Sequence, residues 1–186
     1  MRNSTVTAIP TLYRGIRFRS RLEARWAAFF DQCQWPWRYE PLDLDGYIPD
    51  FVLPFPHGPM LVEVKPALYL EDLRAHTAKI DASGWHHEAV LVSASYFDDD
   101  DCTSHHNSVA IGLLREKCED DTYWWEAGTG FRCGCCGVLS FYHDMQSFRC
   151  RVRGCYDGDH YLGDPARADF AAAWATASNT TQWGQR

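Results

Sequence analysis

The segment YIPDFVLPFPHGPMLVEVKP carries the polar side chains of this chain that are best suited to chemistry. Two apolar runs flank a turn of proline and glycine, with Asp50 on the first run and Glu63 and Lys65 on the second. Side chains alternate between the faces of a strand, so Glu63 and Lys65 are expected on one face. Charged groups within apolar strands need partners, because an unpaired buried charge is costly. Two carboxylates and one ammonium group meeting on a hairpin could hold a divalent metal ion beside a phosphodiester.

The metal expected at such a site is Mg²⁺, or Mn²⁺ in its place, because hard cations prefer oxygen ligands. Asp50 and Glu63 would ligate the ion, and the backbone carbonyl of Val64 could add a third oxygen. The bound metal would acidify a water molecule and offset charge in the transition state, with Lys65 positioning the water or the phosphate. A structural alternative stays open: Asp50 could cap a turn after Pro49, and Glu63 and Lys65 could form a surface ion pair.

This arrangement resembles the PD-(D/E)XK nuclease superfamily. The order of YRGIRFRSRLEARWAAFF, WRYEP, YIPDF and VEVK is similar to that in small phage-type nucleases, TnsA-type endonuclease subunits of heteromeric transposases and Holliday-junction resolvases. The likeness covers residues 11–95, about half of the chain. The residues that carry its central motif are Pro49, Asp50, Glu63, Val64 and Lys65.

The resemblance implies an α/β fold with a restriction-endonuclease-like core, in which helices flank a mixed central sheet. It also implies a metal-dependent endonuclease that hydrolyses DNA phosphodiester bonds, nicking or structure-selective, and leaves 5′-phosphate and 3′-hydroxyl ends. RNA stays open as a substrate. Phage or mobile-element DNA processing is the implied setting, with the protein as a homodimer or as a subunit of a larger DNA-processing complex.

Glu23 stands where the superfamily often carries a further acidic residue on a preceding helix, so the resemblance implies a catalytic role for it. The same glutamate has a second interpretation. Ser20-x-x-Glu23 is a capping-box pattern that opens a helix without any metal. Both roles can hold together.

Basic residues gather near the N-terminus, although the formal net charge of −7 argues against a general polyanion binder. Residues 1–40 hold seven arginines and three acidic residues, a balance of +4, so the remainder carries −11. Phosphate contacts by such a strip would make binding depend on salt, whereas a solvated helix face is the alternative. The arginines expected to contact nucleic acid are Arg14, Arg17, Arg19, Arg21, Arg25, Arg151 and Arg153.

Five cysteines crowd into FRCGCCGVLSFYHDMQSFRCRVRGC, and four of them have the spacing C-x2-C-x13-C-x4-C, close to that of a zinc ribbon. Structural Zn²⁺ sites take four tetrahedral Cys or His ligands. Cys135 competes for a place in this set, and His143 and His160 are reserve ligands; buried thiols or a disulfide are the structural alternative. The expected ligands are Cys133, Cys136, Cys150 and Cys155.

The 186 residues suffice for one α/β domain and a small appendage, and the hydrophobic content of 46% allows a proper core. The chain has neither a run of eighteen apolar residues nor an apolar N-terminal signal, so no membrane association is expected. The cytoplasm of a bacterium or a phage-infected cell is the expected compartment. In that reducing setting the eight cysteines point to metal or free thiols before disulfides.

Periodicity predicts the elements that must position these groups. The expected domains are a nuclease core over 1–125, a zinc-ribbon-like module over 126–162, and a C-terminal helix over 163–186 that begins with Asp164 as cap and Pro165 in its first turn. Lys79 or His76 could face the site from the crossover helix. The expected elements are a helix over 20–33, a strand over 35–40, hairpin strands over 47–53 and 60–65, a crossover helix over 68–80, and a buried strand over 88–95 parallel to the Glu63 strand.

Three function classes follow from these patterns. The first is the endonuclease with a zinc ribbon that helps to grip DNA. The second is a non-catalytic nucleic-acid-binding zinc protein on a nuclease-derived fold, and the third is a structural or partner-recruiting subunit. Because Asp50, Glu63 and Lys65 occur together, the first class is favoured.

Overall fold

The computed structural model describes residues 8–44, 46–98, 108–118, 120, 122–143, 150–155 and 163–182. Its helices are α1 (Arg21–Gln32), α2 (Leu70–Leu73), the 3₁₀ helix η1 (Arg74–His76), α3 (Thr77–Asp81) and α4 (Arg167–Gln182). Its strands are β1 (Thr11–Tyr13), β2 (Ile16–Phe18), β3 (Arg38–Tyr39), β4 (Phe51–Phe55), β5 (Gly58–Val64), β6 (Ala89–Val92), β7 (Val109–Lys117), β8 (Tyr123–Cys133), β9 (Leu139–His143) and β10 (Gly163–Pro165).

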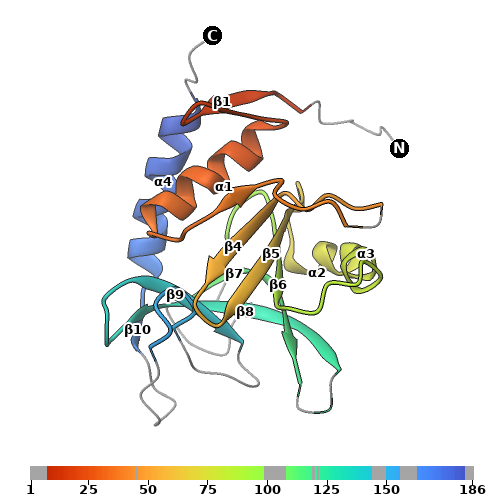
Figure 1. Ribbon diagram of the computed structural model, residues 1–186. Coiled ribbons are helices and arrows are strands. Elements are labelled where there is room, and N and C mark those ends of the chain that lie inside the picture. The colour runs from red at the N-terminus through yellow and green to blue at the C-terminus, as the bar shows by residue number, and fades with distance from the viewer. Residues whose placement is uncertain are drawn as a thin grey trace.

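The fold is α/β, with one mixed eight-stranded sheet between helices (Figure 1). The strand order is β10-β8-β7-β6-β5-β4-β3, with β9 also paired to β8. Strands β5 and β6 pair in parallel, as expected for strands joined by a crossover helix, and the other pairs are antiparallel. Strands β1 and β2 form a separate two-stranded sheet.

Helices cover both faces of the sheet because β5 is apolar on both sides. Met60, Val62 and Val64 belong to the larger core, which α1 and α4 cover, whereas Leu61 belongs to a smaller core with Leu73 of α2. Figure 1 shows α1 and α4 together on one side and the α2–α3 segment on the other. The site residue Glu63 stands two residues after Leu61 on β5. Both side chains therefore lie on the same face of the strand, toward α2 and α3.

Helix α1 forms almost as the sequence predicts. Ser20 is its N-cap, and the Ser20 hydroxyl accepts the backbone N–H of Glu23 at 3.1 Å, while Cys33 closes the C-terminus. The helix packs on α4 through aromatic rings, with Trp26 and Trp174 centroids 4.8 Å apart. Such pairs add about 0.5–1.5 kcal/mol beyond the area they bury, so α4 holds α1 at a fixed position beside the hairpin.

The crossover helix expected over 68–80 is broken into α2, η1 and α3. The hydroxyl of Thr77 donates to the carbonyl of Arg74 at 3.0 Å, and the Thr77 N–H uses the same carbonyl. Side chains that compete for backbone carbonyls in this way favour a tighter turn over a continuous α-helix. The strand expected over 35–40 is likewise shorter, covering Arg38–Tyr39.

The C-terminal part of the chain continues the main sheet. The boundary expected between residues 125 and 126 falls inside β8, a continuous strand that pairs with β7, β9 and β10. The expectation that Asp164 caps the last helix with Pro165 in its first turn is wrong, because both residues lie in β10. Both residues pair with β8 instead of joining the helix, and α4 begins only at Arg167.

Of the helices in the described ranges, none is both long and apolar enough to cross a membrane. The side chain of His143 and the whole of His160, the reserve zinc ligands, lie outside the described residues.

Candidate active site and cysteine cluster

Asp50 and Glu63 lie opposite each other at one end of the β4–β5 hairpin. Phe51 pairs with Val62, so the next position along the antiparallel ladder sets Asp50 against Glu63. Directly opposed side chains of a pair stand on the same face, about 4.5–5.5 Å apart at Cβ. Both side chains are buried, each residue being 5% exposed. The structure therefore brings together the two carboxylates that the sequence singled out.

The carboxylate of Asp50 is held from two sides. Its Oδ2 accepts the backbone N–H of Val64 at 2.8 Å, and its Oδ1 accepts Nη2 of Arg19 at 2.6 Å. The N–H groups of Leu61 and Lys65 donate toward β6, so the N–H and C=O of Val64 face the β4 edge. The Val64 carbonyl thus points toward β4 and Asp50, where it could be the third oxygen ligand of a metal ion.

Glu63 also has two partners. Its Oε2 accepts the hydroxyl of Tyr47 at 2.8 Å, and its Oε1 accepts Nζ of Lys65 at 2.5 Å. Lys65 therefore reaches the carboxyl pair, as its spacing predicts. Tyr47 was not among the site residues predicted from the sequence, although its place in YIPD, three residues before Asp50, was a signal that it comes near the site.

Crowding of negative charge in a buried place changes the titration of the site. Burial, and next the charge of Glu63, raise the pKa of Asp50 to about 7, against the opposing Val64 N–H and Arg19. Burial and Glu63 also raise the pKa of Tyr47 far above its usual value, so Tyr47 remains a hydrogen-bond donor. A divalent cation would remove the repulsion between the two carboxylates, which is the environment that such an ion fits.

Glu23 caps α1 and also joins the site through its neighbours. The Ser20 hydroxyl donates to its Oε1 at 2.7 Å, and the Tyr39 hydroxyl donates to its Oε2 at 2.6 Å. Its charge reaches Asp50 and raises the pKa of that group. Within the described part of the chain, however, the four-cysteine cluster is the group of three or more His, Cys, Asp or Glu residues that is placed to hold a metal ion, and no such group includes Glu23. Glu23 thus lies beside the Asp50–Glu63 pair without closing a three-carboxylate cage.

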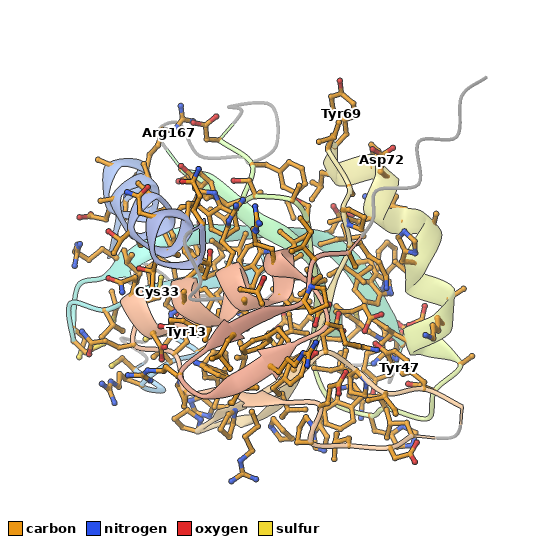
Figure 2. The ribbon with its side chains drawn as sticks, turned by 90° about the horizontal axis from the view of Figure 1, so that it is seen from above. Tyr13, Cys33, Tyr47, Tyr69, Asp72 and Arg167 are labelled. Atoms are coloured by element: carbon orange, nitrogen blue, oxygen red, sulfur yellow. The ribbon has the colours of Figure 1, made fainter. Side chains whose placement is uncertain are left out.

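The segment from η1 to α3 faces the other side of Glu63. Burial and then the charge of Lys65 lower the pKa of His76, whereas Glu63 opposes the shift. Nζ of Lys79 lies 4.4 Å from the centre of the Tyr47 ring. Figure 2 places Tyr47 beside the far end of this helical segment, while Tyr69 projects away from the body of the molecule near the start of α2. Both His76 and Lys79 therefore border the site.

Four cysteines gather in a second site. The Sγ atoms of Cys133, Cys136, Cys150 and Cys155 all lie within 4.8 Å of one another, and those of Cys136 and Cys150 are 3.8 Å apart. Sulfurs bound tetrahedrally to zinc at about 2.3 Å are about 3.8 Å apart. The set could hold a metal ion such as zinc, and Cys135 is exposed outside it. The five clustered cysteines are thiols, without a disulfide among them.

Two turns of the same form present these thiols. Gly137 donates its N–H to the carbonyl of Cys133 at 2.8 Å, and Gly154 donates to Cys150 at 2.7 Å. Both glycines have a positive φ, 73° and 72°, which side-chain-bearing residues rarely adopt. Burial raises the pKa of the Cys133 thiol, but backbone N–H groups from Cys136 and Cys135 outweigh it and lower the pKa. Such N–H donors stabilise a thiolate, the form that binds metal.

The expectation that Arg151 contacts nucleic acid is wrong. Its side chain is 1% exposed, and its guanidinium binds both carboxylate oxygens of Glu88 at 3.0 and 3.1 Å. Its Nη2 also lies 3.3 Å from Glu116, and Nη1 donates to the carbonyl of Phe141. Arg151 joins β7, β9 and the residue before β6 from inside the protein, where no phosphate reaches it.

The other arginines differ in their surroundings. Arg17 and Arg153 are exposed, and Nη2 of Arg153 lies 3.4 Å from the side chain of Gln34. Arg14 is exposed but pairs with Asp31 at 2.9 Å. Arg25 is half-buried over the Trp174 ring, 5.8 Å from its centre, and burial followed by the charge of Arg21 lowers its pKa. Arg19 forms ion pairs with Asp50 and Glu40.

No family model, curated protein or solved structure matches this chain.

Proposed function

We propose that this protein is a metal-dependent endonuclease that hydrolyses DNA phosphodiester bonds on a restriction-endonuclease-like core. The observation that carries the proposal is the buried Asp50–Glu63 pair at the hairpin end, with Lys65 on Glu63 and the Val64 backbone on Asp50. Buried carboxylates forced together inside an apolar hairpin, with the pKa of Asp50 raised as a result, are typical of sites that act on a ligand.

Asp50, Glu63 and the carbonyl of Val64 would hold Mg²⁺ or Mn²⁺. When bound, such an ion acidifies a water molecule and neutralises charge on the phosphate. Two carboxylates and one carbonyl suit magnesium because it keeps several of its waters and uses few protein ligands. Glu23 would adjust the site through its charge and through the hydroxyl of Tyr39.

The chain's own residues prepare the site. Tyr47 donates to Oε2 of Glu63 and fixes that carboxylate, so the other oxygen meets Lys65. The Lys65 ammonium, 25% exposed at its side chain, can turn from Glu63 toward a phosphate or an attacking water. Its flexible stem and three N–H donors suit that change of partner. The exposed arginines near the N-terminus would bind the flanking phosphates.

The cysteine cluster would hold Zn²⁺ as a structural site. Four thiolates leave no open position for a substrate on the ion, so its contribution is to folding. It would fix the turn that links β8 to β9 against the turn over 150–155, which presents Arg153 on the surface. Because the same strand β8 belongs to the main sheet, the zinc would stabilise the sheet that carries the site.

Cleavage assays test the proposal. Duplex, branched and single-stranded DNA, together with RNA, would be incubated with Mg²⁺, Mn²⁺ or no divalent ion. Asp50→Asn and Glu63→Gln should abolish cleavage, and Asp43→Asn, at an exposed carboxylate nearby, should leave it unchanged. Cleavage by Asp50→Asn at the wild-type rate would refute the assignment of the site.

One observation favours the second function class. Each carboxylate of the pair already has a cationic partner, Arg19 on Asp50 and Lys65 on Glu63, which is also how a non-catalytic site would be held. A wild-type protein that binds DNA but cleaves none of these substrates with either metal would establish that alternative.

A further inference from the structure

Arg19 joins a proposed metal ligand to a glutamate outside the metal site. Its Nη2 lies 2.6 Å from Oδ1 of Asp50, while its Nε lies 2.7 Å from Oε1 of Glu40. The side chain is 57% exposed, in contrast to the buried Asp50. Nη2 of Arg19 therefore neutralises the charge of a proposed metal ligand, while more than half of the side chain is open to solvent.

The backbone holds Glu40 in an unusual conformation for this contact. Its φ is +43°, in the left-handed region, and its N–H donates to the carbonyl of Asp50 at 2.9 Å. A side-chain-bearing residue in that region costs about 1 kcal/mol or more, and such strain persists where the surroundings require it. The backbone N–H of Arg19 is in turn fixed by the Tyr39 hydroxyl at 3.1 Å. Arg19 and Glu40 are thus both anchored beside Asp50.

We propose that Arg19 is a positioning residue that neutralises Asp50 while the metal is absent and transfers its Nη2 to a substrate phosphate when the ion binds. Glu40 keeps hold of Nε in both states, so the guanidinium pivots without leaving the site. This inference rests on the proposed metal-dependent cleavage of nucleic acid and adds to it a coupling between the metal and the substrate.

Charge supports this exchange. In the network, four carboxylates (of Glu23, Glu40, Asp50 and Glu63) meet two cationic side chains, those of Arg19 and Lys65. A divalent ion on Asp50 would repel the guanidinium at the same carboxylate, and a phosphate supplies the anion that replaces it. Arginine matches phosphate through two parallel N–H donors, which suits it to both partners. Metal and phosphate should therefore strengthen each other's binding.

The experiment measures Mn²⁺ affinity by electron paramagnetic resonance, with and without a short DNA duplex whose integrity is checked on a denaturing gel. In the wild type, the duplex should tighten Mn²⁺ binding by about fivefold or more. Arg19→Gln should bind Mn²⁺ about fivefold more tightly without DNA and lose most of the effect of DNA. Arg19→Lys keeps the charge but cannot bridge two carboxylates, so it should lie between the two.

The matched control is Arg38→Gln, which removes one positive charge from an exposed position on neighbouring β3. Circular dichroism would verify that each variant folds. If Arg19→Gln and Arg38→Gln shift the Mn²⁺ affinity equally, or if Arg19→Gln keeps the full effect of DNA, the exchange is refuted while the metal site stands. A wild type that binds no Mn²⁺, or an Asp50→Asn variant that binds it unchanged, would overturn the proposed function as well.

Discussion

Nε2 of His57 lies 3.3 Å from the carbonyl oxygen of Gly154. His57 stands in the turn between β4 and β5, and Gly154 stands in the second cysteine turn, so this contact links the hairpin to the cysteine cluster. Asp50 and Glu63 lie at the opposite end of the same hairpin. The two candidate sites therefore lie at opposite ends of one β-hairpin.

A side chain at position 154 should disturb this contact. A Cβ at this position would lie 2.9 Å from Nε2 of His57, and the new residue would have to keep a φ of +72°. Gly154→Ala should therefore lower the free energy of unfolding by more than Gly15→Ala, where φ is +78° but no atom lies within 4 Å of a Cβ. Urea denaturation measures both. The difference should vanish in a His57→Ala background, and its persistence there would contradict the steric cause.

Metal content should depend on four of the five clustered cysteines. Cys136→Ser and Cys150→Ser should each lose the bound ion, expected by elemental analysis as about one Zn²⁺ per chain in the wild type. The melting temperature should fall with it, since Cys150 lies in the core. Cys135→Ser is the matched control, at an exposed thiol outside the set. Loss of zinc from Cys135→Ser would show that the ligand set is different.

The stability of the protein without added divalent ions should fall as the pH rises from about 4 to about 7. Burial and Glu63 raise the pKa of Asp50 to about 7 from 3.8, so the folded state binds the proton more tightly than the unfolded state over this range. The contribution of Asp50 to the free energy of unfolding is fully present below pH 3.8. It declines by up to about 1.4 kcal/mol per pH unit until the pH passes about 7. Urea denaturation at several pH values should show that Asp50→Asn flattens the slope. An unchanged slope in this variant would exclude Asp50 as its source.

Tyr47→Phe should slow cleavage by releasing one oxygen of Glu63. It removes a 2.8 Å hydrogen bond from a buried hydroxyl to a carboxylate, which costs about 1.5–3 kcal/mol. Single-turnover cleavage rates and urea denaturation should both show the loss. The same substitution at Tyr69, which is 70% exposed, should change neither quantity. Equal effects at the two tyrosines would deny Tyr47 a positioning role.

Arg151 and Arg153 should behave oppositely although they are two residues apart. Arg151→Ala removes the buried guanidinium that pairs with Glu88 and Glu116 and should destabilise the fold by about 3–5 kcal/mol. Arg153→Ala, at an exposed side chain, should leave stability nearly unchanged but weaken DNA binding and reduce the salt slope by about 1. Thermal melts and binding titrations at several salt concentrations measure these effects. A DNA-binding loss for a folded Arg151→Ala larger than that for Arg153→Ala would contradict the burial argument.

Local patterns in the sequence predicted the elements that depend on near neighbours. The apolar spacing of α1 and its Ser20 cap placed the helix within one residue, because capping and periodicity are set within one or two turns. The alternation around Glu63 and Lys65, with a short turn before them, predicted an Asp and a Glu on adjoining strands. The cysteine spacing likewise predicted the set of four that the structure brings together.

Contacts between distant segments were decided by the tertiary structure alone. Tyr47 reaches Glu63, and Arg19 and Glu40 converge on Asp50, only because packing sets α1, β3 and the hairpin side by side. Arg151 shows the same limit: the sequence predicted that it contacts nucleic acid, but the half-buried Glu88 and the buried Glu116 hold it inside. The types and spacings of residues therefore determined which groups could do chemistry, and the packing of remote elements decided which of them meet. The physical reason is that capping and alternation are local interactions, whereas the partner of a long charged side chain depends on the whole core.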